Sequence, residues 1–198
     1  MTQWVEESEG GRDRGLRGIT RAWIEVIVRP RRFFEHGVAP ADQAPGLVFA
    51  VIVVLLFQGT RFVFGVDRVP VIADQFVLSV AFWLAFVAVI VTPVALHLVA
   101  ALQTLLLAPF APDRGGVSET VQVIGYATAP CVFAGIPLPP VQVLAVGYGT
   151  ILLGIGLMVV HRIPARKAVV VGAIPAVIVF LGAFRGVHAI EALAGIVG

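Results

Sequence analysis

The sequence predicts an all-α fold: a polytopic transmembrane helix bundle of five spans, N-in/C-out, with an N-terminal amphipathic interfacial helix. Hydrophobic residues make up 59% of the chain and charged residues 13%, whereas a soluble domain carries about 25% charged residues. Apolar runs long enough to cross a bilayer alternate with short polar segments. The cations are concentrated in alternate connecting segments, as they are in membrane proteins with a fixed orientation.

The N-terminal part of the chain is predicted to form a tail and a surface helix. Residues 1–13 are polar and acidic, which favours a disordered tail. Residues 14–36 have a helical period with apolar side chains on one face and arginines on the other, and Pro30 should bend this helix near Arg29. We interpret it as an amphipathic helix on anionic lipid. The alternative is a helix packed on the bundle with solvated arginines. The residues expected at the membrane surface are Arg14, Arg17, Arg21, Trp23, Arg29, Arg31, Arg32, Phe33 and Phe34.

The membrane domain is predicted over residues 47–184, and its first two spans at 47–64 and 78–107. Arg61 lies about one turn from the end of the first span, so its side chain should reach the headgroups. The second apolar run has no turn signal. Its roughly 30 residues would form a helix of about 45 Å, longer than a hydrocarbon core of about 30 Å. We therefore expect one long tilted or kinked helix that contains Pro93 and His97.

The last three spans are predicted at residues 118–135, 141–160 and 168–184, followed by an interfacial segment at 185–198. Small residues that recur on one face of a helix let a neighbouring backbone come close. The residues expected to allow such packing are Gly147, Thr150 and Gly154 in the fourth span and Gly172 and Ala176 in the fifth.

A kink is predicted in the third span between Gly125 and Pro130. Pro130 has no amide hydrogen for the carbonyl of Tyr126, and an unpaired carbonyl at membrane depth is costly. The partners expected for that carbonyl are Thr128, a water, or His97 or Gln103 from the second span. We expect the kink to pack against another helix, with Gly125 permitting the approach. The alternative is a bend that faces lipid.

The orientation follows from the cations. With five spans and the N-terminus inside, Arg68 lies outside, and Arg61 and Arg185 lie at the outer ends of spans. The remaining cations fall on the inside, as the positive-inside rule requires. These are Arg12, Arg14, Arg17, Arg21, Arg29, Arg31, Arg32, Arg114, Arg162, Arg166 and Lys167.

Enzyme chemistry is not indicated. The sequence has no His-Glu-x-x-His pair, Gly-x-Ser-x-Gly elbow or phosphate-binding Gly-Lys-Ser/Thr loop. No carboxylate lies within a predicted span core, and Cys131 is the single cysteine, so we expect no metal and no cofactor. His97 is an ionisable residue in an apolar helix without an obvious partner, and we interpret it as a packing residue rather than a proton carrier.

Several short motifs resemble the Yip family of membrane proteins, named for interaction with Ypt/Rab GTPases, and more narrowly its divergent prokaryotic branch. They are Arg29-Pro30-Arg31-Arg32-Phe33-Phe34, a span and a very long second helix, then Gly115-Gly116 and Gly125-Tyr126-Ala127-Thr128-Ala129-Pro130. The resemblance covers about residues 29–184 and implies five spans and a cytoplasmic N-terminus. For eukaryotic relatives it implies vesicle traffic, contact with prenylated Rab GTPases and oligomers with other family members.

This chain departs from those relatives at two motifs. It has Asp42-Gln43-Ala44-Pro45-Gly46 where they have Asp-Leu-x-Gly-Pro, and their Tyr-rich glycine motif is reduced to Gly125-Tyr126. GTPase binding is therefore not inferred. We expect a non-enzymatic integral protein of the cell membrane that acts as a Yip-like organiser or partner-binding scaffold. Its expected partners are anionic lipids and membrane proteins in homo- or hetero-oligomers, and no nucleic acid. The alternative function is a small transporter or channel, or a permease subunit.

Overall fold

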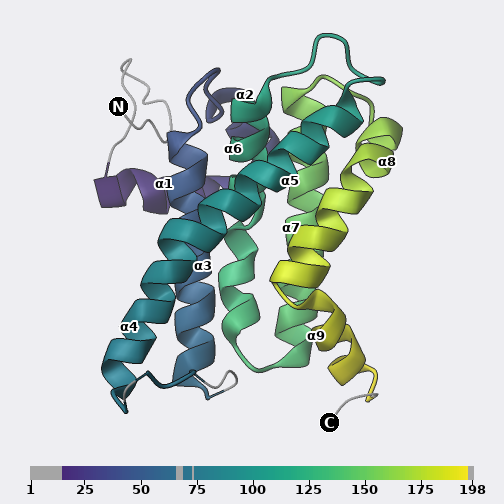
Figure 1. Ribbon diagram of the computed structural model, residues 1–198. Helices are drawn as coiled ribbons and strands as arrows, with labels where there is room; N and C mark the ends of the chain where they lie inside the picture. The colour runs from purple at the N-terminus through teal and green to yellow at the C-terminus, as the bar shows by residue number, and fades with distance from the viewer. Residues whose placement is uncertain (1–14, 66–68, 73, 196–198) are drawn as a thin grey trace.

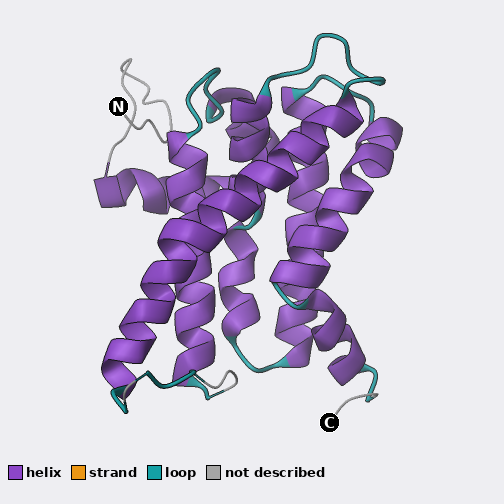
Figure 2. Ribbon diagram, in the orientation of Figure 1, coloured by secondary structure: helices purple, strands orange, loops and turns teal. Residues whose placement is uncertain are grey.

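The predicted all-α class is confirmed by the computed structural model, which describes residues 15–65, 69–72 and 74–195. These residues form helices and connecting turns without β-strands (Figures 1 and 2). The expected tail at 1–13 and the expected lipid contact Arg14 lie outside the described residues.

Two short helices open the described chain: α1 over Gly15–Val28 and α2 over Pro30–His36. Arg29 separates them with φ −134° and ψ 57°, outside the helical region. Pro30 sits in the first turn of α2, where its missing amide costs no hydrogen bond. The helix expected over 14–36 is therefore two helices, and α1 lies across the direction of the long helices (Figure 1).

Four helices in the described part of the chain are long and apolar enough to cross a membrane. They are α3 over Ala44–Val63; α4 over Phe76–Phe86, continued by the π-helical η1 over Val87–Val91 and by α5 over Thr92–Leu107; α7 over Pro139–Val160; and α8 over Ala165–Ala176, continued by the π-helical η3 over Val177–Ala183. The second is one helix of 32 residues.

The segment expected as the third span is not one helix. It consists of α6 over Val117–Ala127 and the 3-10 helix η2 over Ala129–Gly135, and neither alone is long enough to span a bilayer. The α-helix ends where Pro130 can no longer donate a hydrogen bond four residues back. In Figure 1 the two helices together lead from the upper end of the bundle to the lower loop.

In Figure 1, α2 and the loops after α5 and α7 lie at the top of the bundle, α1 lies at its left side, and α9, over Gly186–Leu193, lies at the bottom. The short helix α9 follows Arg185, which has a left-handed backbone with φ 57°.

The core of the bundle is built around α6. Every residue from Thr120 to Cys131 is buried, including the polar side chains of Gln122 and Thr128. The elements α3, α5 and α7 all contact α6. The least apolar of the five segments predicted as spans is therefore the one that the others surround.

Candidate interaction site

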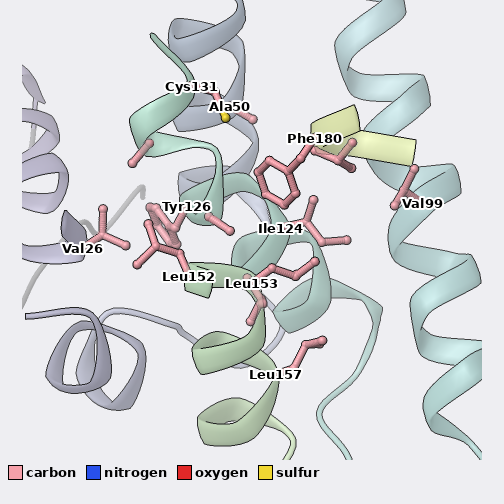
Figure 3. Packing of buried hydrophobic residues seen from close by; sticks show 14 of the residues in the cluster. Val26, Ala50, Val99, Ile124, Tyr126, Cys131, Leu152, Leu153, Leu157 and Phe180 are labelled. Atoms are coloured by element: carbon pink, nitrogen blue, oxygen red, sulfur yellow. The ribbon is translucent and has the colours of Figure 1, made fainter. Parts of the chain in front are cut away.

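Three sequence motifs meet at one place, which we call the motif junction: α2 with Phe33 and Phe34, the start of α3 with Gly46 and Phe49, and α6 with Gln122, Gly125 and Tyr126. Figure 3 shows Tyr126 in the core together with residues of α1 and α7. Up to 93 residues separate the motifs in sequence (Phe33 to Tyr126), so only the fold brings them together.

Aromatic rings form the centre of the junction. The Tyr126 ring lies edge-on to Phe33 and to Phe49, with ring centroids 4.7 and 5.2 Å apart. Trp23 of α1 lies 5.2 Å from Phe49. Such edge-to-face pairs contribute about 0.5–1.5 kcal/mol each beyond the area they bury. The rings therefore hold α1, α2, α3 and α6 in one fixed arrangement.

The backbones of α3 and α6 cross at two glycines. A Cβ on Gly125 would collide with the carbonyl oxygen of Gly46, and a Cβ on Gly46 would lie 2.5 Å from the Cα of Gln122. Because backbone atoms cannot move aside as a flexible side chain can, only glycine fits at both positions. Gly46 belongs to the Asp42–Gly46 stretch and Gly125 to the Gly-Tyr motif, so the two motifs require each other.

Gln122 fixes the loop that enters α3. Its Nε2 donates to the carbonyl of Ala39 at 2.7 Å, and its Oε1 accepts from the amide of the same residue at 3.0 Å. The side chain is fully buried. The glutamine side chain thus bonds to both the amide and the carbonyl of one residue, and neither backbone group is left without a partner.

Two hydrogen bonds fasten α1 to the bundle. Trp23 Nε1 donates to the carbonyl of Ala129 at 3.0 Å, and the Tyr148 hydroxyl of α7 donates to the carbonyl of Ile27. Ala22 and Val26 of α1 are fully buried beside these bonds. The inner face of α1 is thus docked on η2 and α7.

The outer face of α1 combines apolar and cationic side chains. Leu16, Ile24 and Val28 are 82, 59 and 66% exposed and lie on one stripe at multiples of four residues. Arg17 is exposed beside this stripe, and Arg29, Arg31 and Arg32 are exposed in the adjoining turn and α2. Arg21 pairs with Glu25 and Arg31 with Glu35 at 3.1 and 3.5 Å, as (i, i+4) ion pairs. This mixture is the pattern of helices that lie in a membrane interface.

The expected position of three aromatic residues at the lipid headgroups is corrected by their burial. Phe33 and Phe34 are 2% exposed and belong to the motif junction, and the half-buried Trp23 is turned inward to Ala129. The apolar side chains that face outward are instead those of the Leu16 stripe. Because α1 is apolar on two faces, the sequence period could not tell which face meets the bundle.

The close approaches on α7 also differ from the expected positions. No described atom outside the helix's own backbone and nearest neighbours lies within 4 Å of a Cβ built on Gly147 or Gly154, whereas one built on Gly156 would lie 2.7 Å from Val123. Gly149 is similarly pressed against Phe180. Gly147, Thr150 and Gly154 lie on the outward side of α7, and Thr150 and Gly147 are exposed. In the last span Gly172 packs against Leu157 and Ala176 is half-buried.

Thr128, one of the partners expected at the Pro130 break, closes the end of α6. Its amide and hydroxyl donate to the carbonyl of Gly125, and the amide also faces that of Tyr126. Gln103 does not reach this break. Its Nε2 donates at 3.1 Å to the carbonyl of Val171, the carbonyl that Pro175 leaves without its helical donor.

The remaining predicted packing residues lie in the second span. Pro93 opens α5 directly after the π-helical segment η1. His97 is half-buried, and its Nδ1 lies 2.7 Å from the carbonyl of Pro93 in the same helix. Since a carbonyl only accepts, Nδ1 carries the hydrogen. His97 therefore contacts its own helix through this nitrogen rather than the break in α6.

Two buried ionisable side chains had no signal in the sequence. Arg61 is 1% exposed, with its guanidinium carbon 5.5 Å from the centroid of Phe57, so it is enclosed by the bundle rather than extended to the headgroups. His161, after α7, is 1% exposed, and its Nε2 lies 3.4 Å from the Thr120 hydroxyl. Burial, and then the nearby charge of Arg114, lowers the pKa of His161 to about 4, so the ring is neutral at physiological pH.

The described residues contain no group of three or more His, Cys, Asp or Glu side chains arranged to hold a metal ion. The comparison with protein families finds a match to the Yip1 domain over residues 24–185. No curated protein and no solved structure matches the chain.

Proposed function

The chain belongs to the Yip1 domain family, and on this premise we propose that it is a non-enzymatic integral protein of the cell membrane, acting as an organiser or scaffold. The observation that carries the proposal is the motif junction. The residues that define the family resemblance are used to dock α1 and α2, whose outer faces hold exposed arginines beside an apolar stripe. Exposed arginines beside an apolar stripe form a platform suited to lipid or to a partner.

We further propose that the chain has five spans with the N-terminus inside. The cations favour this orientation, and α6 with η2 supplies a fifth crossing in addition to the four long helices. The break is tolerable because the residues on both sides of it, from Thr120 to Cys131, are buried in protein rather than exposed to lipid.

Cysteine labelling separates five spans from four. In a Cys131→Ala background, single cysteines are placed at the exposed residues Gln75, Leu138 and Arg166 and treated with an impermeant thiol reagent in intact cells. With five spans, the cysteines at 75 and 138 are labelled and the one at 166 is protected. If α6 and η2 instead return to the inner side, the cysteine at 138 is protected and the one at 166 is labelled.

The cationic platform should gather anionic lipid. Each cation near such a surface contributes about 1 kcal/mol, and salt weakens the effect. The test compares retention of phosphatidylglycerol over phosphatidylcholine by the purified full chain. Replacing Arg17, Arg29, Arg31 and Arg32 with Gln should reduce this preference about tenfold or more. The control replaces Arg162, Arg166 and Lys167, which lie in and just after the α7–α8 turn away from the apolar stripe. An equal loss in both variants would show that net charge alone attracts the lipid.

The outward glycines of α7 are proposed as the contact with another copy or another membrane protein. Gly147 is exposed and leaves room for a neighbouring helix. A cysteine at Gly147 should cross-link between copies in native membranes, whereas one at the exposed Val169 of α8 should not. Proteoliposomes that take up a solute faster than protein-free vesicles would instead favour the transporter alternative.

A further inference from the structure

A cavity of about 340 Å³ lies inside the bundle between α3, α5, α6 and the two π-helical segments. Figure 3 shows three of its wall residues, Ala50, Val99 and Ile124, which come from three different helices. Phe57, Leu96, Val179 and Phe184 are further buried apolar residues of the wall. The volume and the largely apolar lining are those of small-molecule pockets.

The rim of the cavity is formed by η1 and η3. Val91 of η1 and Ile178 of η3 line it and are 43 and 42% exposed, in contrast to the buried walls. In η1 the Thr92 amide donates to the carbonyl of Val87, and at the end of η3 the Phe184 amide donates to that of Val179. Both bonds reach five residues back. A π-helical turn widens a helix locally and is frequent at functional sites, and here two such turns face one opening.

The lining is neutral but not wholly apolar. None of the described lining residues is charged, and the polar ones are Gln58, Thr92 and Thr128. The Thr128 hydroxyl is already bonded to Gly125. Thr92 is 8% exposed, and its hydroxyl has no hydrogen-bond partner among the described residues. This oxygen is not among the fully buried polar atoms without a partner, so it does not require a hydrogen-bonding occupant, and the lining as a whole suits an apolar one.

The origin of the occupant follows from the position of the rim. Both rim segments belong to helices that are candidate membrane spans, Phe76–Leu107 and Ala165–Ala183. What enters between them comes from the hydrocarbon core of the bilayer and not from water. A neutral, mostly apolar cavity excludes a charged headgroup but accepts a hydrocarbon chain.

We propose that this cavity binds one acyl chain of a bilayer phospholipid, which enters laterally between η1 and η3. The lipid is then a bound component of the protein rather than part of the exchanging lipid around it. This site is independent of the cationic platform on α1 and α2, which lies on other elements and uses charge.

Photolabelling tests the site in the full chain reconstituted in phosphatidylcholine bilayers. The probe is a phosphatidylcholine with a diazirine in one acyl chain, and the adducts are mapped by mass spectrometry. We expect saturable labelling on the cavity-lining parts of α5 and η3. Ala95→Phe, which fills the cavity from α5, should lower this labelling about fivefold or more. Ala101→Phe, at an exposed residue of the same helix outside the cavity lining, should not change it.

Two further variants complete the test. Ala183→Phe fills the cavity from η3 and replaces Ala95→Phe if that variant does not fold. Thr92→Val keeps the shape of the side chain and removes the hydroxyl, so labelling should stay unchanged if the occupant is held by apolar contact. Labelling that rises linearly with probe, spreads evenly over the exposed faces of α4, α7 and α8, or survives both cavity-filling variants would overturn the proposal.

Discussion

The second membrane helix is less buried than its hydropathy suggests, and the α6–η2 segment is more buried. The helix Phe76–Leu107 has the highest mean hydropathy of the four candidate spans, 2.5, yet only 17% of its most apolar window is buried. The α6–η2 segment contains Thr120, Gln122 and Thr128, and every residue from Thr120 to Cys131 is buried. Lipid tails are as apolar as leucine, so an apolar side chain gains little by leaving lipid for the bundle. Close backbone contact and satisfied polar groups decide which segment forms the core.

The largest effect is expected at Gly125. Gly125→Leu puts side-chain atoms where the Gly46 backbone lies, and this overpacking should cost about 3 kcal/mol or more and prevent folding at ordinary temperature. Gly147→Leu, on the outward face of α7, should leave the melting temperature in detergent nearly unchanged because no described atom lies near. Similar melting shifts for the two variants would break the contrast between core and lipid-facing helix.

A smaller difference is expected between two buried glutamines. Gln122→Leu leaves the amide and the carbonyl of Ala39 without partners and should lower stability by about 2 kcal/mol. Gln103→Leu leaves one group, the carbonyl of Val171, without a donor and also removes an Oε1 that has no partner in the described structure, so its cost should be smaller, about 1 kcal/mol. Thermal unfolding in one detergent measures both. A larger shift for Gln103→Leu would mean that the carbonyl freed by Pro175, and not the motif junction, limits stability.

A moderate pH dependence is expected from His161. Its pKa is lowered to about 4 in the folded protein, against about 6.5 in an unfolded chain. Between these values the unfolded chain binds more protons, so stability should fall as the pH drops from about 6.5 to 4 and be fully present above that range. His161→Gln should flatten this part of the melting curve, whereas His188→Gln, at an exposed residue of α9, should keep it. An unchanged slope in His161→Gln would assign the effect to other groups.

The smallest expected effect is a difference in fluorescence quenching between Trp23 and Trp83, which does not involve a change in stability. Single-tryptophan variants that retain Trp23 or Trp83, each with Trp4→Phe, are placed in bilayers with brominated acyl chains. Trp83 lies on α4 beside the exposed Phe82 and Phe86, so lipid should quench it strongly. Trp23 is turned inward to Ala129 and should be quenched less. Stronger quenching of Trp23 would show that α1 leaves the bundle and enters the lipid.

Composition and periodicity were sufficient for the helical class and the membrane character, and the resemblance of short motifs indicated the family; all three are confirmed. They were not sufficient for the faces of α1, because Ile19 and Trp23 turn inward while Leu16 and Ile24 turn outward, and all four are apolar. The break at Thr128 was expected as a kink, and the structure ends the α-helix there, since Pro130 and the Thr128 hydroxyl act together.

Long-range partners were the least predictable part of the site. Gln103 was considered a partner for the carbonyl before Pro130, and it serves the equivalent carbonyl before Pro175 in another helix. Proline positions reveal which carbonyls lack donors, but the pairing depends on which helices are neighbours. The expectation that Arg61 extends to the headgroups failed for the same reason. Its distance from the helix end in sequence does not show that neighbouring elements enclose its side chain.

The enclosure of α6 has a consequence for how the chain enters the membrane during synthesis. A short segment with Thr120, Gln122 and a proline break is a poor candidate to leave the translocation channel alone. It becomes stable in the membrane only when Gly46 of α3, made earlier, receives Gly125 and when α7, made later, covers the opposite side. We therefore expect α6 to remain at the channel until α7 has been synthesised, so that the three segments are released as one unit.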